Sequence, residues 1–575
     1  MVATGTSAPL LRPVPHKRRN DGFGRPVSGP IRKSLEAACS RVLMFAAVFL
    51  TAVPSVPAVE LRSSNLPIVV IDTRGLPVEN ARRIDAVMAV VDHGQGTRNR
   101  VEGPFDGYLG GIRIEIRGSS AVWQGWPKQS YAFETVDGSG NPLDAPVLGL
   151  PDENDWILYG PYTDKTFLRD ALAYRLAADM GRYAPRTRFC ELVMNGGYRG
   201  LYVLVEKIKR DRNRVAIAKM DPADNEGDAV TGGYIIKVDR PAGEENSWWT
   251  SGLSPSPDAK NKVQYLYHYP RPSVITARQR AEIRSFVDSL EILFLEPDWK
   301  SRLEPLFDVD AFIDYVLLNE VTRNVDAYSL STFMHKDRDS RDGRLKMGPV
   351  WDYNLGFGNA DYYAGDSTSG WMIDRKVRLH DRIPFWVGIL WNDPELRGRF
   401  VRRYRGLRSG ILSTERVLGK VDAWADTLAE AEARDHAVYP VLGTYVWPNP
   451  FVGATYGDET AHLKEWIRER LAWMDGATAS VRQGPEFQPE FELGMVYPNP
   501  FNSQATVPIR VDRPAPGRLT VYDVRGRVCA REDLGFLDTG THRYRWDARG
   551  LAAGVYVFQI QCGTGSRRRA AVFIP

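Results

Sequence analysis

The first half of the chain alternates apolar and polar residues in short runs that are typical of β-strands. The run 67–72 is almost wholly apolar, and residues 113–117 read Arg, Ile, Glu, Ile and Arg. Two further runs, 189–194 and 200–205, are separated by Asn-Gly-Gly at 195–197, a sequence that favours a tight hairpin turn. We therefore expect strands to dominate this half.

Apolar positions spaced three to four residues apart indicate amphipathic helices. This spacing appears first at residues 165–180, where Gly181 is suited to end the helix, and it dominates regions 276–320 and 384–480. A strand-rich half that leads into a helix-rich half predicts an α+β domain.

The end of the chain returns to short alternating runs with turn residues between them, at 519–524, 544–547 and 554–560. Several short strands at this spacing predict a small all-β sandwich. The sequence Pro-Glu-Phe-Gln-Pro at 485–489 is typical of a linker.

The start of the chain has the layout of a secretory signal. Arg32, Lys33 and Arg41 precede an apolar run at 42–53, and small residues ending at Ala58 fit a cleavage site. The run is shorter than the roughly 20 residues that a membrane span needs, so we expect no transmembrane helix in the mature protein. The predicted parts are a leader at 1–58, a β-rich N-terminal part at 59–110, the α+β domain at 111–480, a linker at 481–492 and the sandwich at 493–575.

Charge gives no support for a nucleic-acid partner. Residues 1–58 hold eight Lys or Arg against two Asp or Glu, so the rest of the chain carries −2 although the whole chain carries +4. A nearly neutral mature protein lacks the basic surplus of most nucleic-acid-binding domains.

Cysteine and histidine patterns do not support a zinc site, because the chain has neither Cys-x-x-Cys nor His-Glu-x-x-His. Of its four cysteines, only Cys529 and Cys562 lie in comparable strand-like runs near the C-terminus. A disulfide between them remains open, but we favour two separate small buried residues.

The stretch 308–359 carries the candidate chemistry. A helix capped by Asp308 or Asp310 is expected to end near residue 324, followed by strands at 328–335 and 344–350. If these strands pair with His335 opposite Arg344, two acids meet at the open end of the hairpin: Asp326 and Asp352.

Two opposed carboxylates about 5 Å apart repel each other unless a cation lies between them. Mg²⁺ is commonly held by one or two carboxylates together with substrate phosphates. A phosphotransferase uses one Asp to orient the acceptor hydroxyl and a second to hold the metal. Ser331 lies at the spacing where protein kinases place a metal-binding Asn, and Asn354 is a further possible oxygen ligand. From spacing alone, turn capping by Asp326 and a structural hydrogen bond at Asp352 are favoured over catalysis.

Five sequence blocks in order resemble the CotH kinase family, at 117–120 with 127–131, 156–170, 195–206, 324–326 and 348–358. The resemblance implies a distant protein-kinase-like fold that uses ATP and Mg²⁺ to phosphorylate Ser or Thr of exported proteins. It implies that Asp326 is the catalytic acid and that Asp352 binds the metal, whereas Asn354 departs from the acid that the family often has there.

The same resemblance suggests cofactor-binding roles for three further residues. Lys128 is expected on a strand after a Gly/Ser turn, where its ammonium could neutralise nucleotide phosphates. Glu206 could pair with Lys128, coordinate metal or form a structural salt bridge. Arg117 could bind phosphate or support the fold.

The last 80 residues resemble the C-terminal sorting domain of type IX secretion cargo and the related FlgD Ig-like domain, through "YPNPFN", "VYDVRGR" and "WDARGLAAGVYVFQI". The resemblance implies the outer-membrane secretion machinery as a partner and a secreted or cell-surface location. The sequence therefore favours a secreted or surface protein kinase acting on an unknown protein substrate. The alternatives are a non-catalytic surface adhesin and, with less support, a carbohydrate-active protein whose Trp residues stack on sugars.

Overall fold

The computed structural model describes residues 59–479 and 491–575, apart from gaps at 81, 95, 242–245, 254–261, 380–381, 512–513 and 563–564. The predicted signal segment and most of the predicted linker lie outside these residues. The described residues form an α+β region and a separate all-β region, each with its own hydrophobic core. No helix in these ranges is long and apolar enough to cross a membrane.

Seven strands close into a barrel in the order β2-β3-β5-β6-β7-β9-β8. Only β2 and β8 pair in parallel, and the other neighbours are antiparallel. Because β2 and β3 belong to the same closed sheet as the later strands, the boundary expected at residue 110 divides one barrel. The strands are Ile68–Asp72, Ile84–Val91, Tyr108–Arg117, Ser130–Val136, Asp155–Tyr159, Gly197–Glu206 and Thr187–Met194.

The predicted hairpin between β8 and β9 is confirmed. Its turn places Asn195 at φ 51° and Gly196 at φ 73°, and the left-handed region suits these two residue types. The barrel interior is filled by apolar side chains from alternate positions, including Ile112, Ile114 and Leu204.

A second sheet of five strands lies beside the barrel in the order β11-β12-β10-β13-β14. These strands are Trp248–Thr250, Gln264–Tyr269, Tyr234–Val238, Thr332–Lys336 and Lys346–Met347. Short elements complete the region, namely β1 (Ser63–Ser64), β4 (Asn99–Arg100), α2 (Ser119–Gln124), α4 (Asp228–Thr231) and α8 (Asp339–Asp342).

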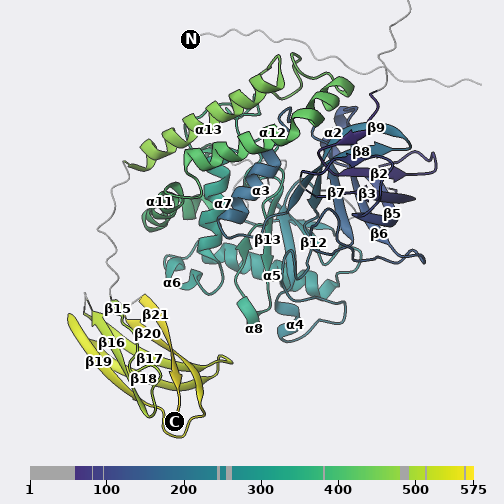
Figure 1. Ribbon diagram of the computed structural model, residues 1–575. Coiled ribbons are helices and arrows are strands. Elements are labelled where there is room, and N and C mark those ends of the chain that lie inside the picture. The colour runs from purple at the N-terminus through teal and green to yellow at the C-terminus, as the bar shows by residue number, and fades with distance from the viewer. Residues whose placement is uncertain are drawn as a thin grey trace, which may run out of the picture. The chain divides into compact units, whose positions relative to one another are not determined.

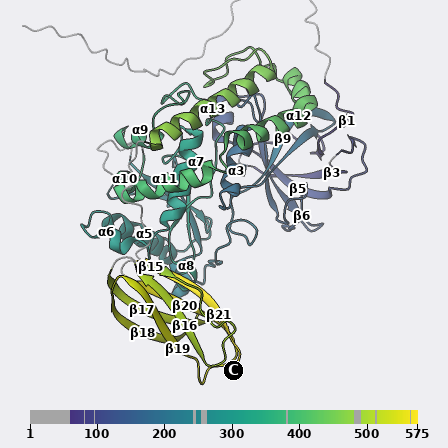
Figure 2. The ribbon, with the colours of Figure 1, turned by 60° about the vertical axis from the view of Figure 1, so that its left-hand side comes forward.

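The longer helices pack around this sheet and along one side of the barrel (Figures 1 and 2). They are α3 (Arg169–Asp179), α5 (Ala277–Leu293), α6 (Trp299–Leu303), α7 (Val309–Thr322), α9 (Met372–Leu379), α10 (Phe385–Asn392), α11 (Pro394–Arg408), α12 (Thr414–Val438) and α13 (Tyr456–Ala479). The predicted strand-rich half and helix-rich half are both confirmed.

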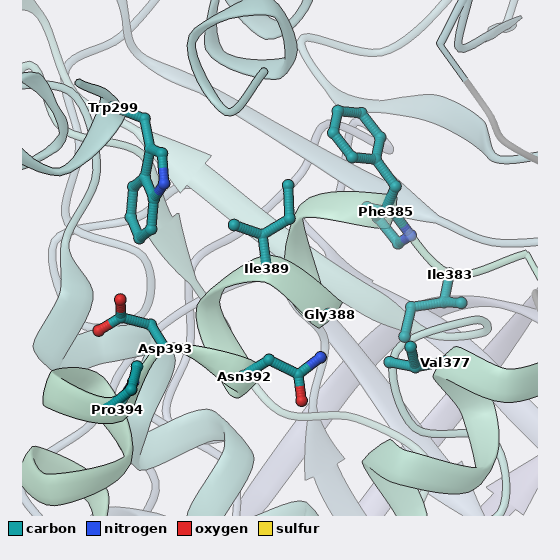
Figure 3. Close-up of a pocket in the computed structure, with 10 residues that line it drawn as sticks. Trp299, Val377, Ile383, Phe385, Gly388, Ile389, Asn392, Asp393 and Pro394 are labelled. Atoms are coloured by element: carbon teal, nitrogen blue, oxygen red, sulfur yellow. The ribbon is translucent and has the colours of Figure 1, made fainter. Parts of the chain in front are cut away.

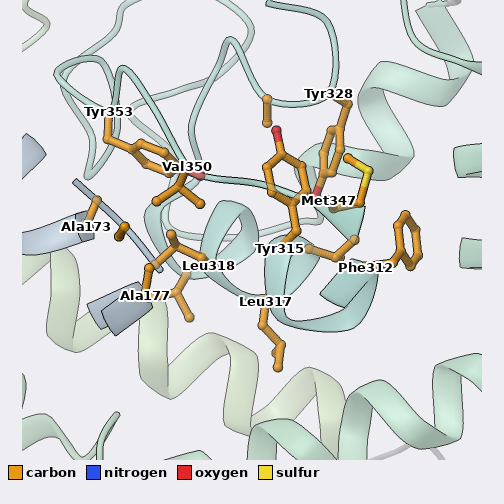
Figure 4. Close-up of a cluster of buried hydrophobic side chains, with 14 of the residues drawn as sticks. Ala173, Ala177, Phe312, Tyr315, Leu317, Leu318, Tyr328, Met347, Val350 and Tyr353 are labelled. Carbon is orange, nitrogen blue, oxygen red and sulfur yellow. The ribbon is translucent and has the colours of Figure 1, made fainter. Parts of the chain in front are cut away.

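Helix α7 is buried almost all round and occupies the centre of this core. The Asp308 carboxylate accepts a hydrogen bond from the Ala311 N–H at 2.9 Å, which caps the helix as predicted. Its side chains meet α3 and the segment after β14, as Figure 4 shows for Leu318 beside Ala173 and Val350. This packing holds the loops at both ends of α7 in fixed positions.

The predicted register of the central hairpin is wrong by two residues. His335 pairs with Lys346 rather than with Arg344. The connection contains helix α8, and the neighbouring Leu345 forms a bridge with Phe307, so the turn is longer than a tight reversal. The first strand is also shorter than expected, because Tyr328 and Ser331 adopt left-handed φ angles of 67° and 47°.

The C-terminal region is the predicted sandwich of two antiparallel sheets. One sheet has the order β15-β16-β19 and the other β18-β17-β20-β21. The strands are Phe491–Leu493, Gln504–Val511, Gly540–Asp547, Val528–Leu537, Ala515–Asp523, Gly554–Cys562 and Gly565–Phe573. Cys562 lies opposite Gly517 and Cys529 lies near Tyr522, at opposite ends of β17, which does not suit a disulfide.

Candidate active site

Asp326 and Asp352 both lie in loops that follow the central elements. Asp326 comes three residues after Arg323, whose left-handed φ of 48° ends α7. Asp352 follows β14 and has a left-handed φ of 67°, which is uncommon for a residue other than Gly, Asn or Asp. Both residues are partly exposed, and the residues directly before and after Asp326 are buried.

A single side chain, Asn324, links the backbones of the two acids. Its Oδ1 accepts a hydrogen bond from the Asp326 N–H at 3.1 Å. Its Nδ2 donates to the Asp352 carbonyl oxygen at 3.2 Å. Asn324 is 3% exposed, so water does not readily replace either bond. The two loops are therefore held at a fixed separation by one amide.

Helix α3 holds the same loop from the other side. The Tyr174 hydroxyl accepts a hydrogen bond from the Asp352 N–H at 3.1 Å. The Asp170 carboxylate accepts one from the Tyr353 N–H at 2.5 Å. Residues four apart lie on the same face of a helix, so α3 presents both acceptors to two consecutive peptide groups. The unusual backbone of Asp352 is stabilised by these contacts.

The acids at this site hold protons more tightly than ordinary carboxyl groups. Burial and the charges of Asp326 and Asp239 raise the pKa of Asp352 to about 7, although the positive charges of Arg117 and Lys237 favour the carboxylate and oppose the rise. Burial and the charge of Asp352 likewise raise the pKa of Asp170 to about 8. Crowded carboxyl groups of this kind gain stability when a cation binds between them.

Three cations lie within electrostatic range of Asp352 or of the neighbouring His268. Arg117 and Lys237 act on the charge of Asp352, and both act together with Lys207 on His268. Burial and these three charges lower the pKa of His268 to about 4, although its hydrogen bond with the Ile208 carbonyl opposes the shift. The site therefore combines positive charge with crowded acids, a combination that suits a phosphate and a metal ion.

Sequence reasoning identified Arg117 but missed Lys237 and Asp239. These two lie at and just beyond the end of β10, two residues apart, and the Lys237 ammonium contacts the Asp239 carboxylate at 2.6 Å. Residues i and i+2 lie on one face of a strand, and this spacing is the sequence signal that could have identified Lys237 and Asp239 as a pair. Asn324 was within a recognised block but had no role assigned to it.

Lys128 and Glu206 bind other partners. The Lys128 ammonium is buried against the Asp435 carboxylate at 2.6 Å, among the rings of Phe167, Tyr202 and Tyr439. Glu206 accepts from Arg186 at 2.8 Å. Lys128 also precedes β6 instead of lying on a strand. The Lys128–Asp435 ion pair therefore joins the barrel to α12.

Asn354 and Ser331 lie in the loops that carry the two acids, and both are partly exposed. The side chain of Asn354 forms a hydrogen bond with the Tyr159 hydroxyl. Within the described ranges, no three His, Cys, Asp or Glu side chains form a ready-made metal cage. Two carboxylates and an amide fit the donor set of a Mg²⁺ ion that takes its remaining ligands from phosphates and water.

A separate cavity of about 580 Å³ opens between α6, α9 and α10. Figure 3 shows its mainly apolar lining, which includes Trp299, Phe385 and Ile389, with Asn392 and Asp393 among the polar residues. None of the acids or cations described above lines it, so it is not part of this site.

Comparisons with known proteins identify two families. The family model described as CotH kinase protein matches residues 114–474, and the secretion system C-terminal sorting domain matches residues 495–572. The sorting domain implies secretion or display at the cell surface.

Among curated proteins, none shows significant similarity to this chain. A solved structure of the Pseudomonas fluorescens alkylpurine DNA glycosylase AlkC, bound to DNA containing an abasic site analogue, matches at 15% identity. The match covers 36% of this chain and 67% of that chain with a TM-score of 0.12, which does not indicate a shared fold.

Proposed function

The chain belongs to the CotH kinase protein family, and on that premise we propose that residues 111–480 transfer the γ-phosphate of ATP to a Ser or Thr hydroxyl of an exported protein. The observation that carries the proposal is the Asn324 bridge, which joins the backbones of Asp326 and Asp352. A distant kinase-like fold is part of the proposal, supported by the strand-rich and helix-rich halves on either side of these acids.

In this proposal Asp352 holds Mg²⁺, with Asn354 and Ser331 as candidate further oxygen ligands. The ion would neutralise charge on the phosphates. Arg117, Lys237 and Lys207 bind the phosphate oxygens, because electrostatic stabilisation is the main contribution an enzyme makes to phosphoryl transfer.

Asp326 orients the acceptor hydroxyl and accepts its proton. A bond forms between the acceptor oxygen and the γ-phosphorus while the bond from that phosphorus to the β-γ bridging oxygen breaks, and ADP leaves. Lys128 and Glu206 are not required for this step, because their side chains are wholly buried in ion pairs with Asp435 and Arg186.

Export is the second part of the proposal. The sorting domain would direct the chain through the outer-membrane secretion machinery, after a signal peptide in residues 1–58 has taken it across the inner membrane. Whether the acceptor is met before or after export depends on where ATP is supplied.

The test is phosphate transfer by residues 59–575, incubated with labelled ATP and Mg²⁺. Asp352→Asn should abolish Mg²⁺-dependent nucleotide binding, whereas Asp326→Asn should retain binding and lose transfer by about 10³-fold. Asp85→Asn, on the exposed surface of β3, is the control and should behave as wild type. If the wild-type protein neither binds nor transfers phosphate, the enzyme proposal fails and the non-catalytic adhesin stands.

A further inference from the structure

Three aromatic side chains form an exposed surface on the two loops at 361–363 and 445–449. Trp447 is 44% exposed, Tyr445 is 54% exposed and Tyr362 is half-buried. We call these three residues the aromatic shelf. A role in binding would account for their position.

Two rings of the shelf form an offset stack. The rings of Tyr362 and Trp447 are parallel to within 8°, and their centroids are 6.0 Å apart. Rings that overlap fully lie closer together, so these two are displaced sideways and each leaves part of its ring face uncovered by the other.

The shelf is also held in place, because hydrogen bonds tie the two loops together. The Asp361 N–H donates to the Pro448 carbonyl oxygen at 2.9 Å, and the Tyr445 hydroxyl donates to the Asp361 carboxylate at 2.7 Å. Asn449 is 2% exposed and donates to the Thr163 carbonyl at 2.8 Å. A surface fixed before a ligand arrives loses little conformational entropy on binding.

The shelf begins beside the candidate active site. Tyr362 packs against a small buried cluster of Val325, Ala360 and Met372. Val325 directly precedes Asp326 in sequence, and the charges of Asp326 and Asp352 both act on the Tyr362 hydroxyl.

We propose that the aromatic shelf binds a hexopyranose ring of a glycan and thereby recruits a glycan-bearing acceptor to Asp326. A pyranose has an apolar C–H face that can stack on the face of an aromatic ring. It also has equatorial hydroxyls that can donate to a carboxylate, and the exposed Asp361 supplies one at the edge of the shelf. A nucleotide fits this surface less well, since the Asp361 carboxylate repels its phosphates.

The recruitment step rests on the proposed function, but sugar binding does not, so it is measured without ATP. Residues 59–575 are titrated calorimetrically with β-1,4-linked hexasaccharides of glucose, N-acetylglucosamine, mannose and galactose. We expect binding of at least one hexasaccharide, about tenfold weaker in Trp447→Ala, given the stacking energy of an aromatic ring. Asp361→Asn should weaken it several-fold while leaving the rings in place.

Trp123→Ala is the matched control, because Trp123 is 82% exposed on α2 and outside the shelf. Equal losses in Trp447→Ala and Trp123→Ala would overturn the proposal, as would absence of binding to all four sugars. So would a Trp447→Ala variant that weakens ATP binding and leaves sugar binding unchanged. If the protein binds sugar but transfers no phosphate, only the proposed kinase function is refuted.

Discussion

Replacing Asn324 by Ala should lower the rate of phosphate transfer by more than the accompanying loss of stability explains. The substitution removes the amide that accepts from the Asp326 N–H and donates to the Asp352 carbonyl. It leaves two backbone groups without that partner in a region where Asn324 itself is 3% exposed. The side chains of Asp326 and Asp352 are unchanged, so any loss of activity comes from their positions.

The two effects have different sizes. Each hydrogen bond contributes about 1 kcal/mol net, so the free energy of unfolding should fall by about 2 kcal/mol. Asp352 has a left-handed φ of 67°, a conformation that costs about 1–2 kcal/mol and lasts only where its surroundings hold it. Without the bond to its carbonyl, the loop can relax. A shift of 1 Å at a catalytic group costs on the order of 10²-fold in rate.

Asn99→Ala provides a matched control in the same chain. Asn99 is 1% exposed, accepts from the His93 N–H at 2.9 Å and donates to the Leu66 carbonyl at 2.8 Å. Both variants should lose similar stability in thermal denaturation, but only Asn324→Ala should lose phosphate transfer, with kcat falling more than KM for ATP rises. Equal transfer rates in the two variants would refute the positioning role of Asn324.

Three further predictions concern other parts of the chain. Because His268 in the folded state has a pKa of about 4, the unfolded chain binds this proton first as the pH falls. The free energy of unfolding should therefore fall by about 2.5 kcal/mol between pH 6.5 and 4, and His268→Gln should reduce this change in urea titrations. Lys128→Met should cost about 3–5 kcal/mol by leaving Asp435 buried and unpaired, and adding Asp435→Leu should recover most of it with ATP binding intact. Loss of ATP binding in that double variant would restore the phosphate role predicted for Lys128. A chain that ends at Ala479 should keep phosphate transfer but fail to reach the cell surface in fractionation.

Features set by neighbouring residues were predictable from the sequence. The Asn-Gly-Gly turn at 195–197, the cap at Asp308 and the end of α7 near residue 324 follow from backbone preferences of a few adjacent residues. The α+β class and the C-terminal sandwich follow from hydrophobic periodicity. This periodicity still distinguishes helix from strand when the predicted bounds of an element are wrong by one or two residues.

Features set by distant residues were not predictable in this way. The phosphate role expected of Lys128 did not take into account Asp435, which lies more than 300 residues away in sequence. Glu206 likewise meets Arg186, 20 residues earlier on the neighbouring chain segment. A charged residue in a strand-rich region carries no local sign of which opposite charge will neutralise it, so its role stays open until the fold is known.

The positions of Asp326 and Asp352 are set by loop contacts and not by the predicted hairpin register. We expected Asp326 and Asp352 to be neighbours because of a hairpin register that is wrong by two residues. A one-residue slip reverses the face of every side chain in a strand, but a two-residue slip preserves it. Neither acid lies in the paired strands, however, so the register does not position them. Their positions depend on Asn324, Asp170 and Tyr174, each of which contacts the backbone of an acid or of the residue beside it. In this domain the loop backbone, more than the strand register, sets the geometry on which catalysis would depend.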